Sequence, residues 1–285
     1  MTSDGPCWEP SCDIKALNVR ARMLRITRRF FEERDVLEVQ MPVLSRHAVT
    51  DPAIECIGTR DGRFLQPSPE YHMKRLLAAG APSIFSIGPV FRADEAGRWH
   101  NTEFTMLEWY RIGFGADDLM RELAALIDAL LGPSDYERRT FAGLIALDIN
   151  HATTDELDLA IADAVARLRD KRVFVTGYPA RQAALARISK GVADRFELVI
   201  NGIEVANGYH ELTDVEELAR RLTADNLARC ERDRPVRDID RAFLAAHARG
   251  LPDCAGVAVG FDRLVALKIG TRAVADVMPF PDDRA

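Results

Sequence analysis

Residues 196–206 read FELVINGIEVA, two runs rich in β-branched and apolar residues on either side of Asn-Gly at 201–202. Asn-Gly is the preferred two-residue turn of a β-hairpin, because both residues readily adopt positive φ angles. A turn of this kind also fixes the strand register, and here it pairs Val199 with Glu204. The stretch therefore predicts two adjacent antiparallel strands joined by a tight turn.

Strand patterns elsewhere in the chain extend this arrangement. Residues 84–92 and 103–110 have the pattern of strands joined by a polar loop, and residues 256–260 form a glycine-bounded strand that enters a helix. Hairpin-linked strands with helices between them favour an antiparallel sheet over a doubly wound parallel one. We therefore expect an α+β fold, an antiparallel sheet flanked by helices. The expected helices cover residues 13–34, 68–80, 117–131, 213–230 and 238–249, with a helical insertion in 133–170.

The composition is that of a globular protein. The chain has 285 residues, 47% of them hydrophobic, and a formal net charge of −6. No apolar run approaches the ~20 residues that a membrane helix needs, and the N-terminal residues lack the features of a secretory signal. The five cysteines are scattered, with no CxxC pair to indicate zinc. We expect a cytoplasmic protein with one domain over residues 1–285 and no membrane contact.

The expected helix over residues 13–34 is basic although the chain as a whole is acidic. Two interpretations remain open: a solvated helix face, or a docking surface for an acidic partner. Its seven basic residues are Lys15, Arg20, Arg22, Arg25, Arg28, Arg29 and Arg34.

The predicted hairpin places two carboxylates on one face. Glu197 and Glu204 are diagonal neighbours, roughly 7–8 Å apart at Cα. Like charges so placed repel each other unless a cation lies between them, and Mg²⁺ bound to phosphates takes one or two carboxylates. The alternative is two solvated acids. Asn207, Tyr209 and Glu211 have the opposite parity, so they reach the same face only if the strand bulges near Asn207-Gly208.

The strand over residues 103–110 has an apolar face and a polar, aromatic one. Phe104, Met106, Glu108 and Tyr110 point one way, because alternate side chains of a strand share a face. Arg92 and Asp94 share a face on the strand before it. Such a surface suits a nucleotide beside a cationic ligand, whereas the alternative is an ordinary solvent-facing sheet with ion pairs.

Read together, these segments resemble the three motifs of class II aminoacyl-tRNA synthetases of the lysyl type. Motif 1 matches the first helix and strand, and motif 2 is similar to FRADEAGRWHNTEFTMLEWY at 91–110. Motif 3 is similar to GVAVGFDRL at 256–264, and SPEYHMKRL at 68–76 and FELVINGIEVANGYHELTD at 196–214 match lysyl-specific stretches. Because motif 1 begins almost at the N-terminus, we expect no anticodon-binding domain.

A catalytic core without that domain resembles the elongation factor P–(R)-β-lysine ligase family, truncated relatives of lysyl-tRNA synthetase. The resemblance implies a homodimer that activates a lysine-like amino acid with ATP and Mg²⁺ and transfers it to elongation factor P, with tRNA an unlikely partner. Two alternatives remain: a small synthetase that charges tRNA or another acceptor, and a non-catalytic paralogue that senses lysine.

The resemblance also implies roles for individual residues. Arg92 and Arg263 would be catalytic, clamping phosphate and carboxylate oxygens, and Glu197 and Glu204 would hold the metal. Ala258 replaces a glycine of the synthetases, which favours a β-amino acid, and Asp94 replaces the usual glutamate of motif 2. The implied ATP-binding residues are Arg92, Ala93, Asp94, Arg98, His100, Asn101, Phe104, Glu204, Val205, Gly260 and Arg263. The implied amino-acid-binding residues are Ser68, Pro69, Glu70, Glu108, Tyr110, Asn207, Tyr209, Glu211 and Ala258.

Overall fold

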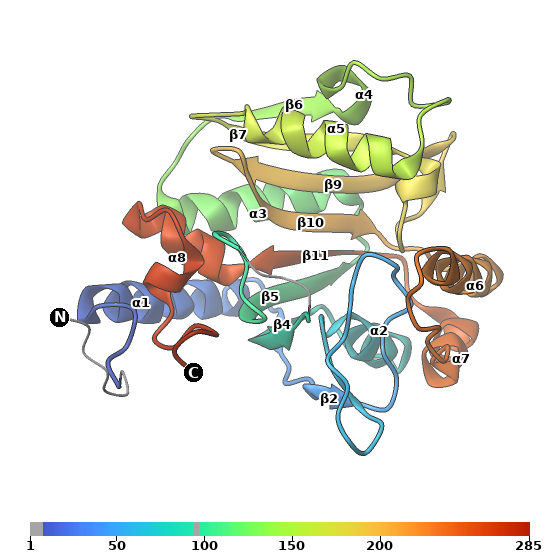
Figure 1. Ribbon diagram of the computed structural model, residues 1–285, viewed down its shortest axis with the longest axis horizontal. Helices are drawn as coiled ribbons and strands as arrows, with labels where there is room; N and C mark the ends of the chain where they lie inside the picture. Colours follow the sequence, from blue (N-terminus) through green and yellow to red (C-terminus); the bar gives the residue numbers. More distant parts are fainter. Residues whose placement is uncertain (1–7, 94–96) are drawn as a thin grey trace.

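A computed structural model describes residues 8–93 and 97–285 and shows a central sheet with helices on both faces (Figure 1). Within the described residues the main sheet has nine strands, and β8 pairs only with β9. The order of the others is β1 (Leu37–Glu38), β4 (Ile84–Phe91), β5 (Glu103–Ile112), β11 (Cys254–Gly260), β10 (Ile203–His210), β9 (Val192–Ile200), β7 (Arg172–Pro179) and β6 (Tyr136–Thr140). Strand β8 is Ile188–Ser189, and β2 (Leu44–Ser45) pairs with β3 (Phe64–Leu65) in a separate small sheet.

The predicted α+β class is confirmed, and the sheet is mixed rather than purely antiparallel. The pairs β1·β4 and β6·β7 at its two edges are parallel, whereas the strands between them are antiparallel. The Asn-Gly hairpin has the predicted register, with Val199 opposite Glu204.

Helices on the back of the sheet cover its apolar face. These are α1 (Ile14–Glu32), α3 (Ala116–Leu131) and α8 (Phe261–Ile269). Leu107 and Trp109 of β5 are fully buried in this core, and Phe31 of α1 contacts the Trp109 ring. The alternation predicted for residues 103–110 is therefore confirmed on the apolar side.

The other helices surround the front face. They are α2 (Glu70–Ala78), α4 (Phe141–Leu144), α5 (Thr154–Ala166), α6 (Val215–Glu231) and α7 (Arg241–Gly250), with 3₁₀ turns at Ala180–Gln182 and Val274–Val277. Helix α7 packs on α2, where the Phe243 and Tyr71 rings stack with centroids 3.9 Å apart. None of the helices in the described residues is long and apolar enough to cross a membrane.

The prediction of a helical insertion in 133–170 is wrong for its first part. Residues Tyr136–Thr140 form the edge strand β6, and only α4 and α5 are helical. The sequence YERRT does not indicate a strand. A solvent-facing edge strand lacks the alternation of apolar and polar residues by which a half-buried strand is predicted.

Candidate active site

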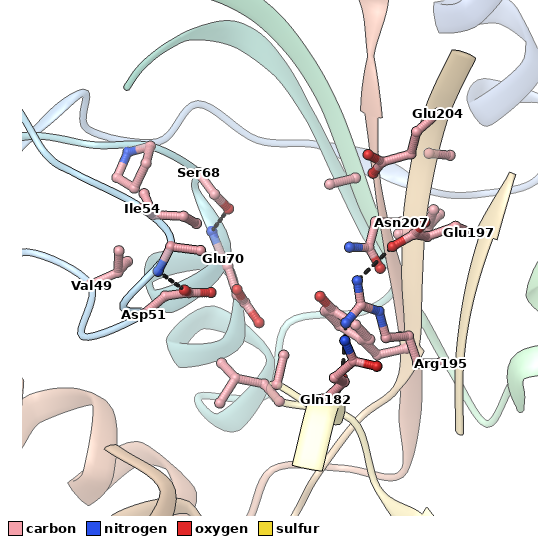
Figure 2. A pocket seen from close by; sticks show the side chains of 18 of the residues that line it. Val49, Asp51, Ile54, Ser68, Glu70, Gln182, Arg195, Glu197, Glu204 and Asn207 are labelled. Carbon is pink, nitrogen blue, oxygen red and sulfur yellow. Dashed lines mark hydrogen bonds and ion pairs between the residues drawn. The ribbon is translucent and has the colours of Figure 1, made fainter. Parts of the chain in front are cut away.

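A cavity of about 850 Å³ lies in front of the strands β5, β11, β10 and β9. Figure 2 shows its two facing walls. Ser68, Glu70 and the loop that carries Asp51 form one wall, and Glu197, Asn207 and Arg195 form the other.

Side chains line the cavity in rungs that cross four strands. Glu108, Ala258, Asn207 and Glu197 are successive partners across β5, β11, β10 and β9. The next rung is Tyr110, Gly256, Tyr209 and Arg195. Partners in adjacent strands point to the same side of a sheet. The polar face predicted for residues 103–110 is therefore the floor of the cavity.

A β-bulge brings the two parts of β10 onto the same face. The register shifts between Glu204 and Ala206, so Val205 is the extra residue. Glu204 lies opposite Val199 and Asn207 lies opposite Glu197, which puts both on the cavity side. The condition stated from the sequence, a bulge near Asn207-Gly208, is therefore met by the bulge at Val205.

A buried carboxylate, that of Glu108, organises the end of the cavity next to α2. It accepts hydrogen bonds from the hydroxyls of Tyr110 and Ser68, each at 2.7 Å. Burial, followed by repulsion from Glu70, raises the pKa of Glu108 to about 7. The helix predicted to begin at residue 68 begins at Glu70 with Pro69 at its cap position, and Ser68 still accepts from the Glu70 N–H at 3.0 Å. Ser68 thereby ties the start of α2 to the floor.

Lys74 lies at the same end, between two of the predicted substrate-binding acids. Its ammonium is 2.6 Å from Glu70 and 2.6 Å from Glu211, and its side chain is 1% exposed. Burial raises the pKa of Glu211 to about 8 despite this partner. Burial alone would lower the pKa of Lys74, but attraction to Glu211 and Glu70 raises it, so the ammonium stays charged.

A second buried cation, Arg195, stands on the opposite wall. It donates to Glu197 at 2.5 Å and to the Gln182 carbonyl at 2.8 Å, and its guanidinium lies 4.3 Å from the Tyr178 ring centroid. Glu197, one of the two predicted metal ligands, therefore already has a cationic partner.

The other end of the cavity carries the predicted nucleotide-binding groups. The Arg92 guanidinium lies 5.2 Å from the Phe104 ring centroid. Arg263, in the first turn of α8, donates to the Glu204 carbonyl at 2.7 Å and to the Trp99 carbonyl at 3.1 Å. Arg263 thus links the hairpin to the loop of motif 2. These residues, together with His100, Asn101, Val205 and Gly260, line the cavity.

Glu204 is a buried carboxylate at this end, and the charges of Arg263, Arg195 and Arg92 offset its burial only in part. Burial, followed by repulsion from Glu197, raises the pKa of Glu204 to about 7. Among the described residues, no cluster of three or more metal-binding side chains exists. A carboxylate pair at the phosphate end fits Mg²⁺, which takes most of its other ligands from phosphate and water.

Some predicted residues lie elsewhere. Pro69, Ala93 and Arg98 are absent from the lining of the cavity. Asp94 lies outside the described residues. The Asn101 amide binds the C-terminal segment, donating to Asp282 at 3.0 Å and accepting from its N–H at 3.1 Å. The side chain of Asn101 therefore holds the loop of residues 97–102 against the C-terminal segment. Only the backbone of Asn101 remains to contact a ligand in the cavity.

Sequence reasoning missed Lys74, which packs against two of the lining acids, and several residues that line the cavity themselves. Lys74 and Glu70 are four apart on a predicted helix, a spacing that does signal a contact. Arg195 lies two residues before Glu197 on the same strand. Because alternate side chains of a strand share a face, the sequence pattern that predicts Glu197 on the cavity side predicts Arg195 there too. Gln182 and Trp99 lie in a 3₁₀ turn and a loop, for which no periodic signal exists.

Comparison with known proteins agrees with this geometry. Residues 13–284 match the family described as tRNA synthetases class II (D, K and N). The chain belongs to this family of class II synthetases.

Within it, the chain groups with the relatives called "Elongation factor P--(R)-beta-lysine ligase". It is 42% identical to the protein of that name from Yersinia enterocolitica over 99% of this chain and 100% of the relative. It is 40% identical to those from Hamiltonella defensa and Salmonella gallinarum, again over 99% of this chain and 100% of each relative.

Proposed function

We propose that the protein activates (R)-β-lysine, or lysine, with ATP and transfers it to a lysine side chain of elongation factor P. One observation carries the proposal: the cavity has arginines at one end and buried carboxylates at the other. An amino acid with a carboxylate at one end and ammonium groups at the other matches that polarity. The choice of elongation factor P as the acceptor and of the β-isomer as the substrate rests on the names of the relatives.

In the first step the amino-acid carboxylate attacks the α-phosphorus of ATP. A carboxyl-oxygen–phosphorus bond forms, the bond to the bridging oxygen breaks, and pyrophosphate leaves. The carboxylate is ionised at pH 7 and needs no base, so catalysis consists of in-line positioning and charge neutralisation. Arg92 suits this role because its planar fork binds oxyanions bidentately, and Phe104 beside it offers a stacking surface for adenine.

Glu197 and Glu204 would hold Mg²⁺ in this proposal. The ion, once bound, neutralises the charge that builds up on the phosphates. The raised pKa of Glu204 supports the assignment, because a cation would remove the repulsion from Glu197 that contributes to it.

In the second step the acceptor amine attacks the carbonyl carbon of the adenylate, and AMP leaves. The amine must first lose a proton, since at a pKa of ~10.4 only about one lysine in a few thousand is neutral at pH 7. Docking of the acceptor protein must therefore desolvate this lysine amine.

We propose further that the protein acts as a cytoplasmic homodimer of single catalytic domains and that tRNA is not its acceptor. The net charge of −6 disfavours a broad phosphate-binding surface. The described cysteines are all free, as in a reducing compartment.

Amino-acid-dependent exchange of pyrophosphate into ATP tests the activation step. We expect exchange with β-lysine, and a loss of at least about a hundredfold in Arg92→Ala, the scale on which a transition-state charge partner contributes. Equal exchange in the two proteins would contradict the proposal. Labelling of tRNA instead of elongation factor P would favour the small-synthetase alternative, and binding of lysine without exchange would favour the sensor.

A further inference from the structure

Lys74 places a buried protein ammonium against Glu70 and Glu211, two carboxylates that line the part of the cavity proposed to receive the ammonium groups of the substrate. Its side chain is 1% exposed and shared between Glu70 and Glu211, with the ammonium 6.0 Å from the Tyr110 ring centroid. A buried cation is costly unless it is paired, so this one must compensate nearby negative charge.

The charge of this pocket can be counted from the groups that face Lys74. In their ionised forms, which are the forms that bind ammonium groups, the carboxylates of Glu70, Glu108 and Glu211 contribute −3, and Lys74 brings the sum to −2. The carboxylate of an amino-acid ligand would lie towards Arg92, outside this pocket. A diamino acid brings two ammonium groups, which match a charge of −2, whereas a monoamino acid leaves one negative charge buried and unpaired.

The other titratable neighbours do not change this sum. His247 of α7 stays neutral because burial, together with the charge of Lys74, lowers its pKa to about 4. Cys254 of β11 stays a thiol because burial raises its pKa to about 12, and burial likewise raises the pKa of Tyr110. On the far wall Arg195 and Glu197 cancel each other. Asp51, the next carboxylate on the near wall, lies beyond Glu70 (Figure 2).

We propose that Lys74 is a positioning and specificity-determining residue of amino-acid activation: shared between Glu70 and Glu211, it sets the pocket charge at −2 and thereby selects ligands with two ammonium groups. The inference rests on the proposed function. Lys74 acts through the two carboxylates and makes no direct contact with the reacting atoms.

The pH dependence of amino-acid binding follows from the same groups. With pKa values of about 7 for Glu108 and about 8 for Glu211, protons occupy these carboxylates near neutrality in the empty pocket. Ammonium groups bind the ionised forms, so the KM for the amino acid falls as pH rises through about 7 to 8. Because Lys74 lowers the pKa of Glu211, its removal moves that fall to higher pH.

The test uses four variants in the exchange assay, Lys74→Met, Lys74→Arg, Glu211→Gln and the double variant Lys74→Met/Glu211→Gln. The probes are the lysine isomer that the wild type uses best and its monoamino counterpart without the side-chain amine, which is 3-aminohexanoic acid for β-lysine and norleucine for α-lysine. Lys74→Met should raise the amino-acid KM at least about tenfold, the effect of one pKa unit, and leave the KM for ATP within about twofold. Lys74→Arg should keep most of the activity and the wild-type pH profile.

The double variant separates charge balance from a merely structural role. Glu211→Gln alone leaves a pocket charge of −1, so the preference for the lysine isomer over its monoamino counterpart should fall about tenfold or more. The double variant returns the charge to −2 and should recover that preference, with a lower amino-acid KM than either single variant.

Several results would overturn the inference. They are an unchanged amino-acid KM in Lys74→Met, a parallel rise in the KM for ATP with a lower melting temperature, and no recovery in the double variant. If the wild type itself exchanges pyrophosphate with no diamino acid, it is the proposed function that fails.

Discussion

The side chains of Tyr110 and Glu211 meet over a backbone position that has no side chain of its own. A Cβ at Gly256 would lie 2.3 Å from the Tyr110 ring and 2.6 Å from the Glu211 carboxylate. Both neighbours are buried and fixed by other contacts, so neither can withdraw without cost. A single methyl group at position 256 is therefore expected to disturb the acidic end of the cavity.

Gly256→Ala should destabilise the protein by ~1–3 kcal/mol, the usual effect of overpacking. Gly88→Ala is the matched control, since it lies in the same sheet and an added Cβ there meets nothing within 4 Å. Its effect should stay within about 0.5 kcal/mol. Urea unfolding followed by circular dichroism measures both. Equal stability of the two variants would show that the pocket relaxes around the methyl group.

Ala258 lies one rung away, between Glu108 and Asn207. In the proposed binding mode its methyl group would crowd an α-amino group, whereas a β-amino acid carries its amine one carbon further along. Ala258→Gly should therefore improve the use of α-lysine relative to β-lysine by roughly tenfold, within the ~1–3 kcal/mol of a methylene-scale contact. The ratio of kcat/KM values in pyrophosphate exchange measures this. An unchanged ratio would assign isomer selection to other residues.

At the scale of elements, the sequence predicted those parts of the site that depend on local periodicity. Asn-Gly at 201–202 was enough to pair Val199 with Glu204, because the turn geometry and the pleat leave one register. The position of the bulge at Val205 was not predictable, since it depends on how β10 fits β9 and β11 together. Lys74 was overlooked for a similar reason: its second partner, Glu211, is far away in sequence.

The loop over residues 51–55 is held against the front of the molecule by helix α6. Arg229 is fully buried and donates to the carbonyls of Asp51 and Ile54 at 3.0 and 3.1 Å, and to the Glu55 carboxylate at 2.5 Å. Since Asp51 and Ile54 line the cavity, one side chain of α6 fixes part of its wall.

Arg229→Met should cost about 3 kcal/mol, the lower end for breaking a buried ion pair, because the carbonyls of Asp51 and Ile54 lose their donor while Glu55 keeps Arg237 as a partner. Arg220→Met, on the same helix, removes an exposed pair with Glu217 and should cost less than about 1 kcal/mol. Thermal and urea unfolding of both variants test this. A small loss in Arg229→Met would mean that the loop holds its position without this residue.

At the scale of the whole molecule, the charges of α1 are distributed unevenly. Arg20 pairs with buried Asp262 of α8, and Arg28 and Arg29 pair with Glu38 and Glu33. Among the described residues, Arg22 and Arg25 are exposed and have no ion pair. The basic face predicted from the sequence is thus narrower than the count of arginines indicated, and Arg22 and Arg25 are the two arginines of α1 whose charge no described carboxylate balances.

If that face guides an acidic acceptor protein, reversing both charges should slow transfer and leave activation unchanged. Electrostatic steering acts between solvent-exposed charges and is screened over ~8 Å at physiological ionic strength. We therefore expect Arg22→Glu/Arg25→Glu to lower the rate of transfer to elongation factor P several-fold at low salt, with the difference vanishing at high salt. Pyrophosphate exchange, which takes place inside the cavity, should stay within about twofold of the wild type at both ionic strengths.

The matched control reverses two exposed arginines on other helices, Arg121 of α3 and Arg220 of α6, whose side chains are 72% and 71% exposed. It changes the net charge by the same amount but leaves α1 intact, so it separates local docking from a general charge effect. Because the proposed function includes a homodimer, light scattering must first show that both variants keep the oligomeric state of the wild type. Equal slowing of transfer in the two variants would reduce the role of α1 to net charge. Normal transfer in the α1 variant would leave its arginines as a solvated helix face.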